Sequence, residues 1–370
     1  MPPKPQVPLA GYTTLRLGGP ARRFTEAPGD AELIAQVRAA DERGEPLLVL
    51  GGGSNLVIAD EGFPGAVVRV ATRDIRHESD GESVLLTVAA GENWDSVAAG
   101  AAADDLSGLE CLAGIPGLTG ATPIQNVGAY GQEVAETLVT VRAYDRDRRE
   151  VVDLSAAECG FGYRTSAFKR SLQSGSGAGP SPVTGRFVVL AVTFRLERSA
   201  LSAPVRYGEL ARALGIREGG RAPLAEVRSA VLALRRGKGM VLDPADPDTR
   251  SAGSFFTNPV LDLAAFDALE RAVAATCGPG VRVPRFPAGP GHIKIPAAWL
   301  IERAGFAKGY PGGATPDGPR ISAKHTLALV NPGGATTAGL LALAREVADG
   351  VRKAFGVDLA AEPVLVGAVL

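Results

Sequence analysis

The sequence is poor in the residues that build disulfides and metal sites. Its 370 residues include only three cysteines and three histidines. Cys111, Cys159 and Cys277 lie far apart and form no Cys-x-x-Cys pair, and no histidine stands at a metal-ligand spacing from a cysteine or another histidine. We therefore expect a reducing compartment, the cytoplasm, with no disulfide framework and no metal site.

An excess of charge of one sign is also absent, and so are long hydrophobic runs. The 39 basic and 40 acidic residues leave a formal net charge of −1, whereas surfaces that bind nucleic acid carry a basic excess. No segment approaches the roughly 18 to 20 apolar residues that span a bilayer. The initial stretch MPPKPQVPLAGYTTL lacks the apolar core of a signal peptide. The sequence predicts neither a nucleic-acid partner nor membrane insertion.

Hydrophobic residues nevertheless make up 45% of the chain, which is ample for a globular core. Because a chain of this length exceeds one typical core, we expect two or three domains of α+β type. The expected strands are 46–50, 56–58, 66–70, 84–90, a hairpin over 138–154, 187–196, 326–331 and 363–367. The expected helices are 31–43, capped by Asp30 and ended by Gly44, and then 222–236, 261–275 and 336–355. The polar, Gly/Pro-rich stretch 171–185 predicts a surface loop.

Two glycine-rich segments stand out. In GGGSN (51–55), backbone N–H groups are open to close approach by a phosphate. Leu56 replaces the third glycine of a Rossmann motif, and Gly239 follows Lys238 where a P-loop needs Ser or Thr. The second segment, 108–134, is a long irregular connection that is costly to order unless something fills it. On the residues alone, the first segment is a turn or a phosphate site, and the second is a loop or one wall of a cofactor site.

A third stretch, SAGSFFTNP (251–259), gathers two of the scarce aromatic residues, which form only 5% of the chain. Phe255 and Phe256 follow Ser254 directly. Serine is ordinarily a turn or cap residue. The residues alone therefore leave open whether Ser254 is a turn residue or a chemical group.

Together these segments resemble the UDP-N-acetylenolpyruvoylglucosamine reductase (MurB) family, in its first subtype with a tyrosine loop. The matching stretches are TTLRLGGPARRF, VLGGGSNLVI, AGENWDSV, AGIPGLTGATPIQNVGAYGQEV, ECGFGYRTSAFK, LDPADPDTRSAGSFFTNP, IPAAWLIERAGFAKGY, ISAKHTLALVN and EPVLVG. They run almost from one end of the chain to the other. The resemblance implies an α+β protein with an FAD-binding fold of the vanillyl-alcohol-oxidase (PCMH) type.

In that reading the FAD-binding region has two subdomains, 5–72 and 73–198, and an α+β substrate-binding domain follows at 199–370. The last strand of the chain can return towards the FAD site. The resemblance also implies non-covalent FAD and NADPH as the hydride donor. The implied cofactor-binding residues are Leu50, Gly51, Gly52, Gly53, Ser54, Asn55, Gly114, Ile115, Pro116, Gly117, Gly120, Ala121, Gln125, Asn126 and Gly128.

The implied reaction reduces the enolpyruvyl group of UDP-N-acetylglucosamine enolpyruvate to give UDP-N-acetylmuramate for peptidoglycan synthesis. Hydride addition builds negative charge beside the substrate carboxylate, and a proton must then reach the neighbouring carbon. By motif match, Arg164 stabilises the charge, Ser254 donates the proton and Glu362 supports the enol. The implied substrate-binding residues are Tyr163, Tyr207, Lys238, Asn258, Lys294 and His325, of which His325 stands where the motif often carries an amide.

We expect a monomer, although the sequence carries no direct signal of oligomeric state. Two alternatives to the reductase are an FAD oxidase of an alcohol or hydroxy acid and a UDP-sugar-binding regulator that has lost catalysis. The joint presence of GSFFTNP and EPVLVG disfavours the oxidase. The joint presence of Arg164, Ser254 and Glu362 disfavours the regulator.

Overall fold

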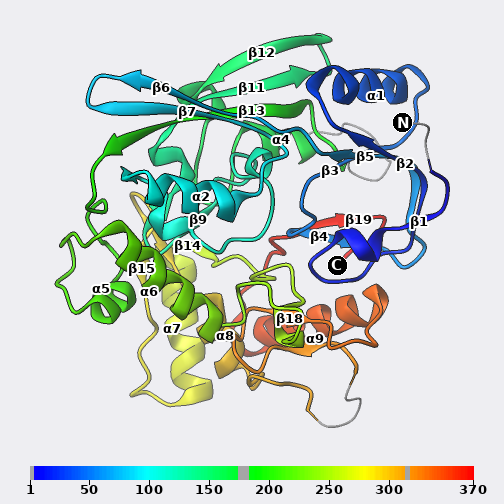
Figure 1. The fold of residues 1–370 in the computed structure, drawn as a ribbon. Coiled ribbons are helices and arrows are strands. Elements are labelled where there is room, and N and C mark those ends of the chain that lie inside the picture. Colours follow the sequence, from blue (N-terminus) through cyan, green and yellow to red (C-terminus); the bar gives the residue numbers. More distant parts are fainter. Residues whose placement is uncertain (1–3, 174–182, 313–316) are drawn as a thin grey trace. The chain divides into compact units, whose positions relative to one another are not determined.

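A computed structural model describes residues 4–173, 183–312 and 317–370 (Figure 1). The chain divides into two compact units. Unit 1 comprises Met1–Pro8, Pro20–Gly53 and Gly62–Val241, and unit 2 comprises Leu9–Gly19, Ser54–Glu61 and Leu242–Leu370. Most of the surface loop predicted at 171–185 lies outside the described residues.

The first sheet of unit 1 is mostly parallel and has the order β1-β2-β5-β3. Strands β2 (Pro20–Ala27), β5 (Phe63–Val70) and β3 (Leu47–Leu50) run parallel, and β1 (Val7–Pro8) is antiparallel to β2. Nearly continuous apolar runs such as β3 suit a parallel sheet, whose strands are buried on both faces. The strands predicted at 46–50 and 66–70 are confirmed.

Helix α1 (Asp30–Glu42) follows β2 and packs one face on this sheet. The buried face carries Leu33, Val37 and Ala40. The predicted cap is wrong, because Gly29 takes the N-cap position and Asp30 is the first helical residue. There the Asp30 carboxylate interacts with the helix dipole instead of bonding to a backbone N–H. Gly44 adopts φ +59 just after the helix, as expected of a glycine that ends it.

The second sheet of unit 1 is antiparallel, in the order β12-β11-β13-β7-β6, and β8 pairs with the C-terminal end of β13. Its strands are β6 (Ile75–Asp80), β7 (Ser83–Ala89), β8 (Leu106–Ser107), β11 (Leu138–Asp145), β12 (Glu150–Ser155) and β13 (Phe187–Arg198). The predicted hairpin is confirmed as β11 and β12. Helix α2 (Trp94–Ala103) covers one face, where the ring of Trp94 lies 5.7 Å from that of Phe194 (Figure 1).

Residues 199–241 pack within unit 1, through α5 (Gly208–Leu214) and α6 (Leu224–Gly237). One hydrophobic cluster joins Leu210 and Val231 of these helices to Cys111. This packing differs from the expected boundary at 199, because the apolar faces of α5 and α6 are buried on the glycine-rich segment that precedes them in the chain. The division of the FAD-binding region at residue 72 stays a prediction.

Unit 2 buries its core among α7 (Leu263–Cys277), α8 (Ala297–Arg303) and α9 (Thr337–Phe355). The helices predicted at 261–275 and 336–355 are confirmed. The strand predicted at 326–331 is reduced to β18 (Leu329–Val330), because the N–H of Ala328 donates to the carbonyl of His325 and closes a turn before it.

The C-terminal strand β19 (Val364–Val366) pairs in parallel with β4 (Leu56–Ile58), and both belong to unit 2. The end of the chain therefore lies beside the strand that directly follows the first glycine loop. The remaining short elements are β9 (Gly128–Ala129), β10 (Gln132–Glu133), α3 (Ala156–Cys159) and α4 (Ala167–Gln173) in unit 1, and β14 (Val260–Asp262), β15 (Phe286–Pro287), β16 (His292–Lys294) and β17 (Arg320–Ile321) in unit 2.

Candidate cofactor and active site

The first glycine loop touches the second glycine-rich segment through backbone alone, within unit 1. A Cβ added to Gly52 would stand 2.7 Å from the Cα of Gly117, well inside the normal separation of carbon atoms. Gly53 has φ +61, in the left-handed region that favours glycine. The fold thus requires glycine at both positions. Gly52 lets the first glycine loop approach the backbone of Gly117, and Gly53 allows the turn.

The second segment adds its own glycine requirements. Gly114 has φ +70 and Gly117 has φ +130. A Cβ on Gly120 would stand 2.5 Å from the Cβ of Ala90. Residues 115–118 are half-buried although their neighbours on both sides are buried. Pro116 has no backbone N–H, but Ile115, Gly117 and Leu118 each carry one. Such a half-buried strip can present N–H groups to a pyrophosphate, so these residues fit the FAD that the sequence predicts.

The predicted cofactor-binding residues divide between the two units. Leu50 to Gly53 and the predicted residues of 114–128 belong to unit 1, and Ser54 and Asn55 belong to unit 2. Leu50 is completely buried in the core of unit 1. Its side chain is therefore not available to a ligand, and its position matters as the end of β3.

Arg164 occupies a tight turn of unit 1 that is closed by two hydrogen bonds between Gly162 and Thr165. Its φ of +53 is uncommon for a residue other than glycine. The guanidinium donates from Nη2 to the carbonyl of Gly128 at 2.9 Å and lies 5.5 Å from the ring centre of Tyr163. These contacts hold a cation beside the glycine-rich segment, and a strained backbone at a fixed cation points to a functional position.

Asn126 joins this turn to the glycine-rich segment. Its side chain is buried, donates from Nδ2 to Glu133 at 2.7 Å and to the carbonyl of Gly162 at 3.2 Å, and accepts from the N–H of Ala135 at 3.1 Å. The carboxamide is thus used to fix the Arg164 turn. A contact between Asn126 and a cofactor would have to come from its backbone.

Unit 2 brings Ser254 and Glu362 onto neighbouring segments, although they lie far apart in the sequence. The N–H of Glu362 donates to the carbonyl of Phe255 at 2.9 Å, and the N–H of Phe255 donates to the carbonyl of Leu327 at 2.7 Å. The residue after Ser254 is therefore held from both sides by backbone bonds. Two of the three predicted catalytic residues thus lie on segments of unit 2 that a backbone hydrogen bond joins.

The loop around Ser254 has rigid ends. Gly253 has φ +74, and its N–H donates to the hydroxyl of Ser251 at 3.2 Å. Phe255 and Phe256 are each 1% exposed and lie edge to face, with ring centres 5.2 Å apart. Ser254 is half-buried between these two anchors. The loop therefore holds the backbone of Ser254 between two fixed neighbours.

Asn55 links the end of the first glycine loop to Glu362. Its side chain donates to the carbonyl of Glu362 at 3.4 Å, and its own carbonyl accepts from the N–H of Val364 at 2.9 Å. The segment that carries Glu362 is thus anchored to a residue that the sequence assigns to cofactor binding.

Among the predicted substrate-binding residues, Tyr207 and Lys238 come together in unit 1. The rings of Tyr207 and Tyr130 lie edge to face, with their centres 5.5 Å apart. The ammonium nitrogen of Lys238 lies 5.6 Å from the centre of the Tyr130 ring. Lys238 also pairs with Glu209 at 2.6 Å. Burial raises the pKa of Tyr130 to about 12, so its phenol is neutral at neutral pH. Tyr163 adjoins Arg164 and is exposed.

The other predicted substrate-binding residues belong to unit 2. The carboxamide oxygen of Asn258 accepts from the N–H of Ala297 at 2.9 Å, which caps α8. Lys294 lies in β16 and pairs across the sheet with Val260. His325 starts the turn before β18. Asn258 thus has a structural task that the sequence did not indicate.

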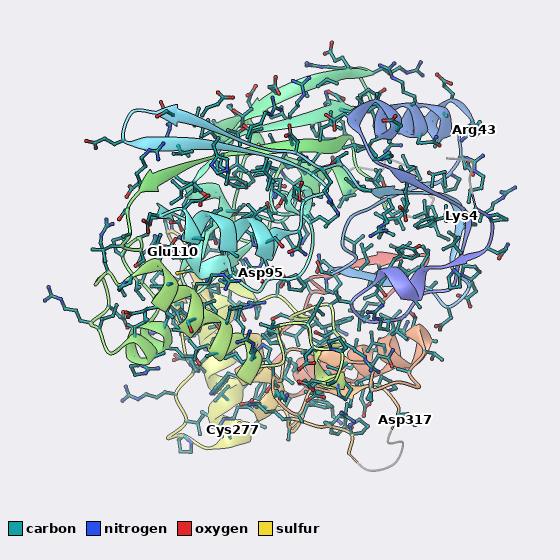
Figure 2. The ribbon with its side chains drawn as sticks, in the orientation of Figure 1. Lys4, Arg43, Asp95, Glu110, Cys277 and Asp317 are labelled. Atoms are coloured by element: carbon teal, nitrogen blue, oxygen red, sulfur yellow. The ribbon has the colours of Figure 1, made fainter. Side chains whose placement is uncertain are left out.

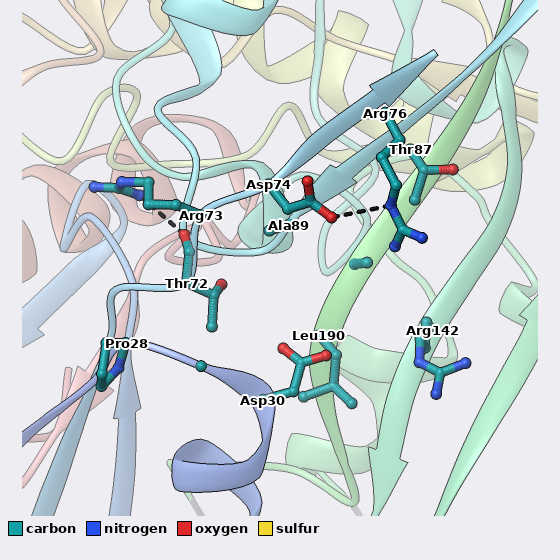
Figure 3. A pocket seen from close by; sticks show the side chains of 12 residues that line it. Pro28, Asp30, Thr72, Arg73, Asp74, Arg76, Thr87, Ala89, Arg142 and Leu190 are labelled. Atoms are coloured by element: carbon teal, nitrogen blue, oxygen red, sulfur yellow. Dashed lines mark hydrogen bonds and ion pairs between the residues drawn. The ribbon is translucent and has the colours of Figure 1, made fainter. Parts of the chain in front are cut away.

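A pocket of about 320 Å³ opens elsewhere in unit 1 (Figure 3). It gathers charges of both signs, including Asp30, Arg76 and Arg142. Burial raises the pKa of Asp30, against the lowering effect of Arg142 and Arg76. None of the predicted cofactor or substrate residues lines this pocket, so it is distinct from the candidate site.

Two of the three cysteines are buried, and the described part of the chain gathers no set of metal ligands. Burial raises the pKa of Cys111 and of Cys159 to about 12, so both thiols are protonated at neutral pH. Residues 4–173, 183–312 and 317–370 contain no group of three or more His, Cys, Asp or Glu placed to hold a metal ion.

Sequence reasoning missed the residues that hold the glycine-rich segment in place. Trp94 and Asp95 lie in the stretch AGENWDSV, which matches the family but received no role. Their contacts with Leu112 and Gly114 join residues about twenty positions apart. The one signal in the sequence that could have pointed to Trp94 and Asp95 is that AGENWDSV matches the family although no role was assigned to it.

Comparison with known proteins identifies the family. Residues 24–155 match the family described as FAD binding domain, and residues 244–366 match that described as UDP-N-acetylenolpyruvoylglucosamine reductase, C-terminal domain. The UDP-N-acetylenolpyruvoylglucosamine reductase of Thermobifida fusca is 58% identical to this chain over 98% of both sequences. The chain belongs to the UDP-N-acetylenolpyruvoylglucosamine reductase family.

Another reductase of this name, from Streptomyces coelicolor, is 57% identical over 98% of this chain and 90% of its own length. The crystal structure of the reductase from Thermus caldophilus matches with a TM-score of 0.63 and 26% identity over 99% of both chains. The predicted family and α+β fold class are confirmed: an FAD-binding domain is followed by the C-terminal domain of the reductase family. The protein is an FAD-dependent oxidoreductase. Within the described ranges, no helix combines the length and apolar character needed to cross a membrane.

Proposed function

We propose that this reductase uses NADPH to reduce the enolpyruvyl group of UDP-N-acetylglucosamine enolpyruvate, giving UDP-N-acetylmuramate for peptidoglycan synthesis. The observation that supports this most strongly is the end-to-end similarity to relatives that carry the name of that activity. The cytoplasmic location and the monomeric state stay predictions.

The proposed chemistry assigns one task to each of three residues. When bound, FAD supplies the hydride. Arg164, held by the carbonyl of Gly128, binds the substrate carboxylate and stabilises the charge that develops beside it. The hydroxyl of Ser254 donates the proton to the neighbouring carbon. Glu362, whose backbone is bonded to that of Phe255, supports the enol and the proton transfer.

The proposal places the UDP part of the substrate against Tyr207 and Lys238. An ammonium group suits a diphosphate, and Tyr207 is 44% exposed, so its ring has area left to cover a ligand. Because Glu209 pairs with Lys238, a bound diphosphate would compete with this carboxylate for the ammonium. Asn258, Lys294 and His325 are also proposed to contact the substrate.

An anaerobic titration tests the function. The purified protein should be yellow, should lose its colour on addition of NADPH, and should regain it when the enolpyruvyl UDP-sugar is added without oxygen. A colourless protein that FAD cannot reconstitute would contradict flavin chemistry altogether. Reoxidation by oxygen but not by the UDP-sugar would favour the oxidase of an alcohol or hydroxy acid.

A further inference from the structure

The start of α2 runs alongside the middle of the glycine-rich segment in unit 1. The N–H of Thr119 donates to the carbonyl of Glu92 at 2.9 Å, and the N–H of Trp94 donates to the carbonyl of Gly117 at 3.2 Å. Residues 92–94 and 117–119 thus form a short stretch of paired backbone. This pairing fixes one end of the half-buried strip 115–118.

The side chain of Trp94 extends the contact further along the segment. Its indole Nε1–H donates to the carbonyl of Leu112 at 3.0 Å, and the ring is 1% exposed against Phe194. A hydrogen bond this far from water is electrostatically stronger than one at the surface. Trp94 therefore holds Leu112 in place on the other side of the strip.

Asp95 contacts the segment between Leu112 and residues 117–119. Its Oδ1 accepts from the backbone N–H of Gly114 at 2.7 Å, a charge-assisted and short bond. Gly114 has φ +70, and a Cβ there would stand 2.7 Å from Cδ2 of Leu232. Since the N–H of Gly114 points to Asp95, the task of this glycine is to set the path of the chain. Figure 2 shows Asp95 at the start of α2.

Arg228 of α6 holds Asp95 in turn. Its Nη2 lies 3.3 Å and 3.4 Å from the two carboxylate oxygens of Asp95, and the two side chains are 26% and 38% exposed. The Nε of Arg228 is buried and bonds to no protein atom. Asp95 therefore balances a guanidinium that is only partly satisfied, and the pair connects α2, α6 and Gly114.

Arg235 adds a second cation to this network. It lies about two turns after Arg228 on the same side of α6 and donates from Nη2 to the carbonyl of Met240 at 2.9 Å. Its Nε lies 3.5 Å from the position that a Cβ of Gly114 would take. Burial lowers the pKa of Arg235, and the nearby Asp95 carboxylate opposes that lowering. The Asp95 carboxylate thus offsets positive charge on both sides of Gly114.

We infer that Asp95 is a positioning residue for FAD: its carboxylate, held by Arg228, sets the conformation of Gly114 and so the shape of residues 115–118. The inference rests on the proposed assignment of residues 114–128 to the cofactor. Glycine-rich backbone loses much conformational freedom when it is ordered. A neighbour that orders it before the ligand arrives raises affinity, because the ligand no longer has to supply that ordering.

The test compares the FAD affinity of four holoenzymes by the rise in flavin fluorescence on dilution. Loss of a bond to a charged group should weaken FAD binding about 10- to 100-fold in Asp95→Ala. Asp95→Asn keeps an oxygen for the N–H of Gly114 and should recover most of that loss. The matched control is Asp104→Ala, which removes an exposed carboxylate from the opposite end of α2 and should leave the affinity unchanged.

Two further readouts separate positioning from a general effect on folding. The visible absorption of bound flavin should shift in Asp95→Ala and keep the parental shape in Asp104→Ala. Asp95→Ala should lower the melting temperature of the FAD-bound protein more than that of the FAD-free protein. Equal lowering in both forms, with an unchanged FAD Kd, would show that Asp95 only stabilises unit 1 and would overturn the inference.

Arg228→Gln provides a second variant if Asp95→Ala does not fold. It leaves Asp95 in place but removes its ion-pair partner, and it should weaken FAD binding severalfold. An FAD Kd equal to that of the parent would contradict the inference. These measurements involve no UDP-sugar. A parent protein that binds FAD but is not reoxidised by that sugar would therefore contradict the proposed function without affecting this test.

Discussion

The glycine-rich segment 108–134 of unit 1 and the serine loop 251–258 of unit 2 are both irregular, but they are held in different ways. The first is held by side chains of α2, mainly Trp94 and Asp95, together with backbone bonds to residues 90–94. Backbone bonds hold the second, from Phe255 to Leu327 and to Glu362, with Phe255 and Phe256 as its own anchors. The stability of the glycine-rich segment therefore depends on residues of α2, whereas that of the serine loop depends more on its own residues.

The difference follows from what each loop presents to its surroundings. The glycine-rich segment presents backbone along the strip 115–118, and this strip is fixed by contacts on both sides of it. The serine loop offers a side chain, so its backbone groups are available to pair with neighbouring segments. A substitution in the serine loop should therefore directly change the stability or the activity of that loop. The glycine-rich segment should respond mainly to substitutions in residues that contact it.

The largest effect should come from Ser254→Ala, which removes the hydroxyl that the serine loop presents. General acid catalysis contributes about 10²- to 10⁴-fold, so reoxidation of the reduced enzyme by the UDP-sugar should slow by about that factor. Reduction by NADPH should stay nearly unchanged. Stopped-flow absorbance of the flavin measures each half separately.

The control for this variant is Thr257→Ala, which removes a hydroxyl from the same loop whose bond to the carbonyl of Ala360 is 3.4 Å long. Both half-reactions should keep nearly the parental rate in Thr257→Ala. If Ser254→Ala slows the two halves equally, Ser254 is a turn residue and its assignment as proton donor is wrong.

The second largest effect should come from Phe256→Ala, which removes one anchor of the serine loop. A phenylalanine that is 1% exposed should cost about 3–5 kcal/mol of unfolding free energy when it is truncated. Urea unfolding measures this. Phe256→Leu keeps most of the volume and should cost much less, and equal costs for the two variants would show that Phe256 does not anchor the loop through packing.

A smaller effect should follow from Gly120→Ala in the glycine-rich segment. The added Cβ would stand 2.5 Å from the Cβ of Ala90 and 3.0 Å from its Cα, so backbone has to move. Overpacking of this kind costs about 1–3 kcal/mol. FAD affinity should fall together with the unfolding free energy. An unchanged Kd for FAD would mean that the segment can shift without disturbing the cofactor.

The smallest effect should come from Gly253→Ala in the serine loop. No atom lies within 4 Å of the added Cβ, and only the φ of +74 opposes the change. Left-handed backbone costs an L-residue about 1–2 kcal/mol. Urea unfolding should show this loss without a change in FAD affinity. A cost above that of Gly120→Ala would reverse the contrast between conformational strain in one loop and steric crowding in the other.

The sequence by itself determined the elements with strong local patterns and the family. Helix α9, strand β3 and the hairpin of β11 and β12 follow from apolar spacing within one short window. Such spacing is decided by which face of a helix or strand is buried, and neighbouring residues carry that information. The motifs around Arg164, Ser254 and Glu362 also lie in contiguous stretches, which is why a resemblance could be found from the sequence.

The tertiary structure alone decided which distant segments meet. Examples are the pairing of β19 with β4, the packing of α5 and α6 in unit 1, and the bond from Gly114 to Asp95. Each of these contacts buries apolar area or satisfies polar groups between residues far apart in the chain. A local sequence pattern does not show which distant residue will be the partner. For the same reason, the spacing of Ser254 and Glu362 could not show that their backbones are joined through Phe255.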